Sequence, residues 1–146
     1  MSLLIIRKKR KGLSMLKVEQ LQAIAERYEI NTFYLFGSYN EGSYNEDSDI
    51  DLAFLSTDYK NNINYGSLYF DLQEVANCKI DLIDLRKAPL TFAYSIIKEG
   101  RVIYDLDEDT RTDFEDDTIK KYLDFLTFHR LIQAELDDNF KLEGKT

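Results

Sequence analysis

The chain has 146 residues, of which 44% are hydrophobic and 32% charged, a composition that suits one domain with a buried core. Its 19 basic and 27 acidic residues give a net charge of −8, so an extended nucleic-acid surface is not expected. No apolar run is long enough to span a membrane and no signal peptide is evident, while a single cysteine argues against a disulfide framework and fits a reducing cytoplasm.

The first fourteen residues differ in charge from the rest of the chain. All five of their charges are positive and lie between Arg7 and Lys11. Without these five, 14 basic and 27 acidic residues remain, a net charge of −13 that favours a basic partner protein. We predict an N-terminal extension over residues 1–14, which need not be ordered, and a single folded domain over residues 15–146.

The next part of the chain predicts a helix and two strands. Apolar residues at helical spacing predict a helix over Leu16–Tyr28. The aromatic run Thr32–Phe36 predicts a strand, and a second strand follows over residues 49–55. The loop between them, residues 37–48, is polar, and part of it could form a short helix whose N–H groups face phosphate.

Two carboxylates stand at the start of the second strand. Because residues i and i+2 of a strand face the same side, Asp49 and Asp51 should project together, with Ile50, Leu52 and Phe54 toward the core. Two neighbouring carboxylates repel each other, and a divalent cation relieves that repulsion. Mg²⁺ prefers carboxylate oxygens together with substrate phosphates, so the pair is a candidate magnesium site.

A Gly-Ser pair, Gly37 and Ser38, comes directly after the first strand. Glycine allows the backbone to approach a phosphate closely, and the N–H groups and the hydroxyl are donors. Taken singly, a Gly-Ser pair is usually a turn and an Asp-x-Asp pair a solvated strand end. The order strand, Gly-Ser, ten residues, Asp-x-Asp, strand indicates a phosphoryl-transfer site.

The middle of the chain predicts a second helix over Tyr65–Val75 and a third strand over Lys79–Leu85. That strand carries Asp81 and Asp84, which lie three residues apart and therefore face opposite sides. Periodicity alone does not say which of the two joins the site.

The C-terminal part predicts a helix between Pro89 and Gly100 and a short edge strand over Arg101–Tyr104. Residues 105–117 are the most acidic part of the chain, which we interpret as a loop and helix start, with a docking surface for a basic partner as the alternative. A last helix is predicted from about Asp116 to Asn139. Its apolar residues cover more than half of its circumference, so we expect its distal half to pack on another chain.

The spacing G-S-x(10)-D-x-D resembles the signature of the polymerase β-type nucleotidyltransferases. In so short a chain, the run Ser48-Asp49-Ile50-Asp51-Leu52 is similar to the minimal nucleotidyltransferases (MNT), the antitoxins paired with HEPN proteins in prokaryotic toxin–antitoxin modules. The resemblance extends from about Leu16 to about Ile132. One position departs from the pattern, because the family often has a basic residue before the second glycine and this chain has Glu41.

We expect an α/β (α+β) fold with a small mixed or antiparallel sheet that carries helices on one side. The resemblance implies the nucleotidyltransferase core followed by a C-terminal helix. It implies Asp49, Asp51 and Asp81 as catalytic and Mg²⁺-binding residues, and Gly37 and Ser38 as ligands of the ATP phosphates. It further implies that AMP is transferred to a tyrosine hydroxyl of a HEPN-type toxin ribonuclease.

Two other functions stay open. The chain could be a catalytically degenerate module that neutralises its partner by contact, through the acidic stretch and the last helix. It could also transfer AMP to a small molecule such as an aminoglycoside. In each case we expect a cytoplasmic protein, and a hetero-oligomer or a homodimer formed through the C-terminal helix.

Overall fold

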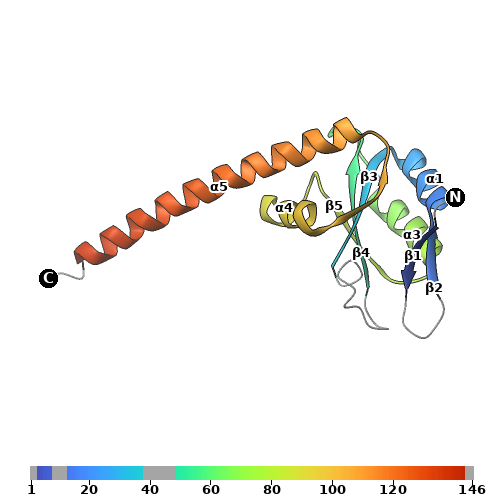
Figure 1. The fold of residues 1–146 in the computed structure, drawn as a ribbon, viewed down its shortest axis with the longest axis horizontal. Coiled ribbons are helices and arrows are strands. Elements are labelled where there is room, and N and C mark those ends of the chain that lie inside the picture. Colours follow the sequence, from blue (N-terminus) through green and yellow to red (C-terminus); the bar gives the residue numbers. More distant parts are fainter. Residues whose placement is uncertain (1–2, 8–12, 38–48, 144–146) are drawn as a thin grey trace.

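The computed structural model describes residues 3–7, 13–37 and 49–143 (Figure 1). Among these residues, no helix has the length and apolar character needed to cross a lipid bilayer. The described elements, in chain order, are β1 (Leu3–Arg7), β2 (Leu13–Lys17), α1 (Val18–Tyr28), β3 (Ile30–Phe36), β4 (Ile50–Ser56), α3 (Tyr65–Ala76), β5 (Ile80–Asp84), α4 (Leu90–Glu99), β6 (Arg101–Asp105) and α5 (Glu108–Glu143).

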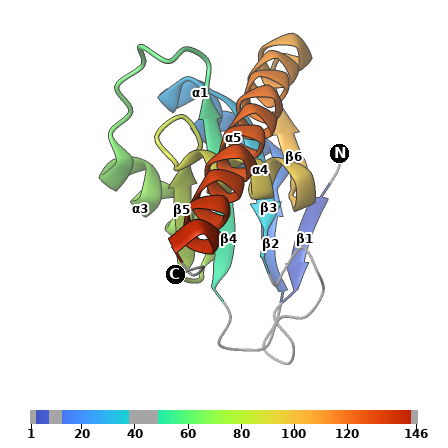
Figure 2. The ribbon, with the colours of Figure 1, turned by 90° about the vertical axis from the view of Figure 1, so that its left-hand side faces the viewer.

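A four-stranded sheet in the order β5-β4-β3-β6 forms the centre of the molecule (Figure 2). β3 is antiparallel to both β4 and β6, whereas β4 and β5 are parallel, so the sheet is mixed. The predicted α/β fold with a small mixed sheet is confirmed. The prediction of β6 as a short edge strand is confirmed as well, because it pairs with β3 alone.

Helices cover both faces of this sheet, and the prediction of helices on one side was wrong (Figure 1). Leu52 and Phe54 of β4 belong to the core cluster shared with α1 and α3. Ala53 and Leu55, which point the other way, belong to a second cluster with α4 and the first turns of α5. All four are fully buried, because β4 is a continuous apolar run between two helical layers.

A two-stranded hairpin precedes α1. β1 and β2 pair antiparallel, from Leu3 opposite Lys17 to Arg7 opposite Leu13. The hairpin takes in part of the predicted N-terminal extension, and the division of the chain after residue 14 stays a prediction. The expected start of the first helix at Leu16 was wrong, because the strand continues through Lys17 and α1 begins at Val18.

The last helix, α5, has 36 residues and begins at Glu108 rather than near Asp116. Asp107 caps it, because its carboxylate accepts hydrogen bonds from the N–H groups of Asp109 and Thr110 and from the Thr110 hydroxyl. The acidic stretch therefore forms the first turns of the helix, where negative charge is favourable. The interpretation of residues 105–117 as a loop and helix start agrees with the structure, and only the predicted helix start near Asp116 was too late.

Only the first part of α5 is fixed to the sheet. The buried Tyr34 hydroxyl donates to Glu115 at 2.8 Å, and Arg111 bridges Asp105 at 2.8 Å and Glu115 at 3.0 Å. Farther along the helix, Tyr122 stacks on Tyr94 of α4 with ring centroids 3.8 Å apart. The remainder extends away from the sheet (Figure 1).

Candidate active site

Two of the predicted site carboxylates are neighbours across the parallel strand pair. Asp51 of β4 is in register with Asp81 of β5, so both side chains stand on the same face of the sheet. This is the face that carries α4, since Ala53 lies two residues after Asp51 and packs in that cluster. Ile50, Leu52 and Phe54 are buried on the opposite face, as predicted.

Asp84 has a separate position and a separate role. Its carboxylate accepts a hydrogen bond from the Arg86 N–H at 3.0 Å, and its carbonyl accepts one from the Lys87 N–H at 3.1 Å. These contacts close the turn after β5. The pairing of β4 with β5 thus places Asp81, and not Asp84, beside Asp51.

The electrostatics of Asp51 reflect this grouping of like charges. Its pKa is raised from 3.8 to about 6, chiefly by burial and further by the negative charges of Asp81 and Asp49. Asp49 lies directly before β4 and is exposed, as is Asp81. A half-buried carboxylate between two exposed ones creates a strongly negative position that a bound cation would stabilise.

Gly37 lies against this carboxylate. β3 ends at Phe36, which is paired with Asp51, and the chain then turns at Gly37 with a φ of 71°. A β-carbon at Gly37 would overlap Asp51 Oδ2, so no other residue fits here without displacement. Ser38, the second predicted phosphate ligand, lies outside the described residues, as does Glu41.

The carboxylates of Asp51 and Asp81 suit a hard divalent cation, although the described residues do not form a complete set of metal ligands. Among residues 3–7, 13–37 and 49–143, no group of three or more His, Cys, Asp or Glu side chains is arranged to hold a metal ion. The pair Asp51 and Asp81 offers carboxylate oxygens from rigid strands, with Asp49 at the adjoining strand end. Oxygen donors of this kind are those that Mg²⁺ takes when substrate phosphates complete its coordination.

Two residues near the site were missed by the sequence analysis. Phe92 of α4 packs edge-to-face against Phe36 with ring centroids 6.0 Å apart, and Phe36 is the register partner of Asp51. Lys79 directly precedes β5, and its carbonyl accepts a hydrogen bond from the Ile50 N–H at 3.0 Å. No local signal identifies Phe92, whereas the two-residue spacing from Lys79 to Asp81 could have identified Lys79.

Comparisons with known proteins also indicate a nucleotidyltransferase. Residues 19–109 match the family model described as polymerase beta, nucleotidyltransferase. The protein adenylyltransferase MntA of Shewanella oneidensis is 32% identical over 81 residues, which are 56% of this chain and 58% of that relative. The chain therefore spans less than two thirds of the length of this curated relative.

Two solved structures share the fold. A toxin–antitoxin crystallised with AMP-PNP has a TM-score of 0.66 at 26% identity, over 82% of this chain and 97% of the other. An MNT antitoxin in complex with a tri-AMPylated HEPN toxin of Shewanella oneidensis has a TM-score of 0.61 at 23% identity, over 82% and 94% of the two chains, a likeness in fold. With a matching family model over most of its length, a mixed sheet of the same fold and carboxylates on neighbouring strands beside a glycine turn, the chain belongs to the polymerase β nucleotidyltransferase family.

Proposed function

We propose that the chain is an antitoxin that transfers AMP from ATP to a tyrosine hydroxyl of a HEPN-type toxin, in a Mg²⁺-dependent reaction in the cytoplasm. The observation that carries the proposal is the register of Asp51 with Asp81, directly beside the turn at Gly37. It joins a candidate cation site to a backbone that can approach a phosphate. The similarity to a named protein adenylyltransferase and to a toxin–antitoxin crystallised with AMP-PNP supports the choice of reaction.

In this proposal, Asp49, Asp51 and Asp81 would hold Mg²⁺. When bound, the metal supplies positive charge to the nucleotide phosphates and to the attacking oxygen. Gly37 and Ser38 hold the β- and γ-phosphates through backbone N–H groups and the serine hydroxyl. The fixed strand positions of Asp51 and Asp81 keep the reacting groups in place without further rearrangement.

The transfer itself is an in-line displacement at the α-phosphorus. The bond from the tyrosine oxygen to this phosphorus forms while the bond to the β-phosphate oxygen breaks, and pyrophosphate leaves. In this proposal Asp81, whose carboxylate is exposed, takes the proton of the tyrosine hydroxyl. Asp51, which is half-buried between the strands, is less accessible to an incoming acceptor.

A protein acceptor suits the open placement of this site. Asp49 and Asp81 are exposed at one end of the sheet, and a tyrosine on a protein surface could reach them. A small acceptor such as an aminoglycoside would need walls to hold it. Beyond the sheet, the C-terminal part of the described chain continues as the single helix α5 and forms no second lobe.

The distal part of α5 is the surface that we propose binds the toxin. From Leu123 onward this helix carries eight large apolar side chains that are exposed in the isolated chain. They are Leu123, Phe125, Phe128, Leu131, Ile132, Leu136, Phe140 and Leu142. An apolar face of this length on a helix that leaves the sheet is typical of a protein–protein contact.

The intact mass of a HEPN-type toxin, measured after incubation with the chain, ATP and Mg²⁺, tests the proposal. We expect a gain in units of AMP that is lost with the Asp49→Asn, Asp51→Asn double variant and kept with Asp84→Asn. A stable complex without any mass gain would instead support inhibition by contact alone. The absence of both a mass gain and a stable complex would overturn the proposal of a protein acceptor. A screen against aminoglycosides would then follow.

A further inference from the structure

The loop that should hold the nucleotide phosphates provides no cation. Residues 37–48 contain Glu41, Glu46 and Asp47 but neither lysine nor arginine. Asp49, Asp51 and Asp81 add further negative charge. A bound triphosphate is itself a polyanion, so a positive side chain from another segment would strengthen its binding considerably.

Among the residues that the structure describes, Lys79 is a basic residue that directly borders the carboxylates. Its carbonyl accepts the Ile50 N–H at 3.0 Å, and Ile50 is in register with Ile80, so the backbone of Lys79 lies alongside that of Asp49. Lys79 precedes Asp81 by two residues and stands directly before β5, at the end of the sheet where Asp49 and Asp51 lie. The Lys79 side chain is exposed.

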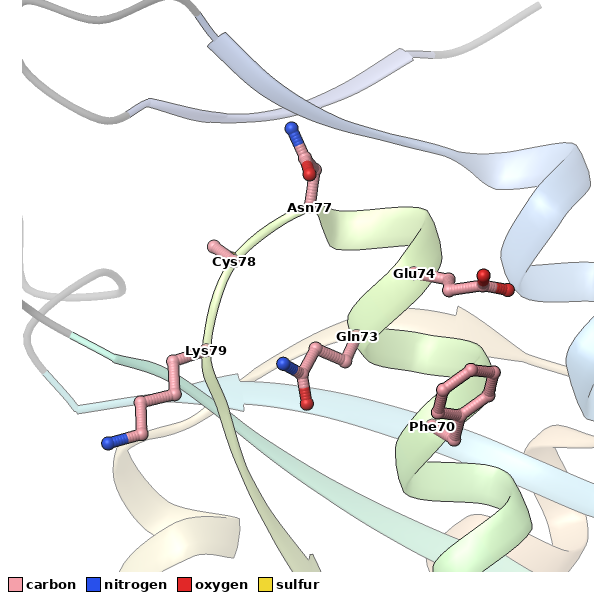
Figure 3. A pocket seen from close by; sticks show the side chains of 6 residues that line it. All are labelled: Phe70, Gln73, Glu74, Asn77, Cys78 and Lys79. Carbon is pink, nitrogen blue, oxygen red and sulfur yellow. The ribbon is translucent and has the colours of Figure 1, made fainter.

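Figure 3 shows how this side chain lies. Lys79 is at the rim of an open hollow formed mainly by the end of α3 and the segment that leads into β5. Its ammonium group extends away from Gln73 and Glu74, two of the α3 residues that line that hollow. No hydrogen bond or ion pair among the described residues fixes it in another direction. Toward the described residues the ammonium group is thus not committed to a partner, and it lies at the end of the sheet where β4 begins.

Four other basic residues near the sheet are less suitably placed. Arg86 and Lys87 follow the far end of β5, and Arg86 is held by the Ser56 carbonyl at 2.8 Å. Arg101 pairs with Leu35, whose side chain belongs to the α1 and α3 face, opposite to Asp51. Lys98 lies in the last turn of α4, which leads into β6 at the other edge of the sheet.

We propose that Lys79 binds the β- and γ-phosphates of the nucleotide and the pyrophosphate that leaves. This inference rests on the proposed nucleotidyl transfer and adds to it a phosphate-binding residue outside the Gly-Ser loop. An ammonium is a compact charge that suits phosphate oxygens without fixed geometry. Its interaction strengthens as the bond to the β-phosphate oxygen breaks, because negative charge then accumulates on the leaving group.

Calorimetric titration of the full chain with AMP-PNP, pyrophosphate and AMP, each with Mg²⁺, tests this role without any acceptor. We expect Lys79→Gln to weaken AMP-PNP and pyrophosphate binding by about tenfold or more and AMP binding little. Lys79→Arg, which keeps the charge, should restore most of the affinity. Lys87→Gln, an exposed lysine beyond the other end of β5, is the matched control and should bind all three ligands as the unaltered chain does.

Each outcome decides a separate point. Equal AMP-PNP affinity for Lys79→Gln and the unaltered chain would overturn the role of Lys79 and leave the proposed function intact. An equal loss for AMP and AMP-PNP would also overturn it, because the effect would then not concern the terminal phosphates. Failure of the unaltered chain to bind AMP-PNP would overturn the proposed function and the role of Lys79 together.

Discussion

The backbone of Gly37 lies directly against the carboxylate of Asp51, where a β-carbon would overlap Asp51 Oδ2. The contact arises because β3 pairs Phe36 with Asp51 and the chain then turns with a left-handed φ of 71°. A phosphate held by this turn would therefore adjoin a carboxylate that can bind its metal. The glycine and the aspartate act as one structural unit, although fourteen positions separate them in the sequence.

Gly37→Ala should abolish AMP transfer and also lower stability. A left-handed alanine costs about 1–2 kcal/mol, and the added methyl group displaces the Asp51 side chain. Thermal unfolding and the toxin mass assay measure the two effects. Gly66→Ala is the matched control, because Gly66 lies in the first turn of α3 and a β-carbon there meets only Asn64 Oδ1 at 3.7 Å. AMP transfer by Gly37→Ala at the rate of the Gly66→Ala control would refute the role of this turn.

Asp51→Asn should stabilise the chain in the absence of metal. The pKa of Asp51 is about 6 in the folded state against 3.8 ordinarily, so the folded state holds the proton more tightly than the unfolded state. Stability is accordingly lost as the pH rises from about 4 to about 6, and the loss persists above that range. Asparagine carries no charge and removes this loss, which is of the order of 1 kcal/mol once partial exposure is discounted.

Denaturant unfolding of both proteins in EDTA, at pH 3.5 and pH 7.5, measures this effect. The Asn variant should be the more stable protein at pH 7.5, with a much smaller difference at pH 3.5. Asp84→Asn should show no such gain, because its carboxylate already serves the turn at Arg86. A destabilised Asp51→Asn protein at pH 7.5 would mean that the carboxylate is compensated within the fold.

Asp81→Asn and Asp84→Asn should separate in activity, although the two residues share one strand. Asp81 stands beside Asp51 in the register of β4 with β5, and its loss should reduce AMP transfer by a hundredfold or more if it serves as a base, on the order typical of such groups. Asp84 closes a turn at the other end of β5, and its amide replacement should retain transfer within a few-fold. Initial rates from the mass assay compare them, and a reversed order would show that the acceptor approaches from the other face.

The features of this site that depend on a short segment of sequence could be predicted, whereas those that depend on the pairing of distant strands could not. The strand ends at Gly37 and Asp49, and the inward direction of Ile50 and Leu52, follow from alternation within a short segment. The choice between Asp81 and Asp84 could not be made from periodicity, because it depends on the pairing of β4 with β5, which lie far apart in the sequence. The family resemblance indicated Asp81, and the register places it beside Asp51.

Long-range packing also explains the predictions that were wrong. The buried run of β4 does not reveal that helices cover both of its faces, because that depends on where α4 and α5 pack. The early start of α5 depends on a single capping residue, Asp107, within an acidic stretch that resembles a loop. The proximity of Phe92 to Phe36 requires the docking of α4 on the sheet and has no counterpart in the local sequence.

The distal part of α5 should be dispensable for folding but required for binding the toxin. Phe128 and Ile132, one turn apart and 64% and 39% exposed, lie beyond the Tyr94–Tyr122 stack that fixes the helix to α4. Replacing both with Gln should leave the thermal unfolding of the isolated chain nearly unchanged, because few contacts within the chain are lost. Toxin binding should weaken by about tenfold or more, as expected when large apolar residues are lost from an interface centre.

Asp137→Asn, nine residues after Phe128 and hence on the opposite side of the helix, is the control that should bind normally. Biosensor affinities for the three proteins decide the matter, and full toxin binding by the double Gln variant would move the docking surface away from this face of α5.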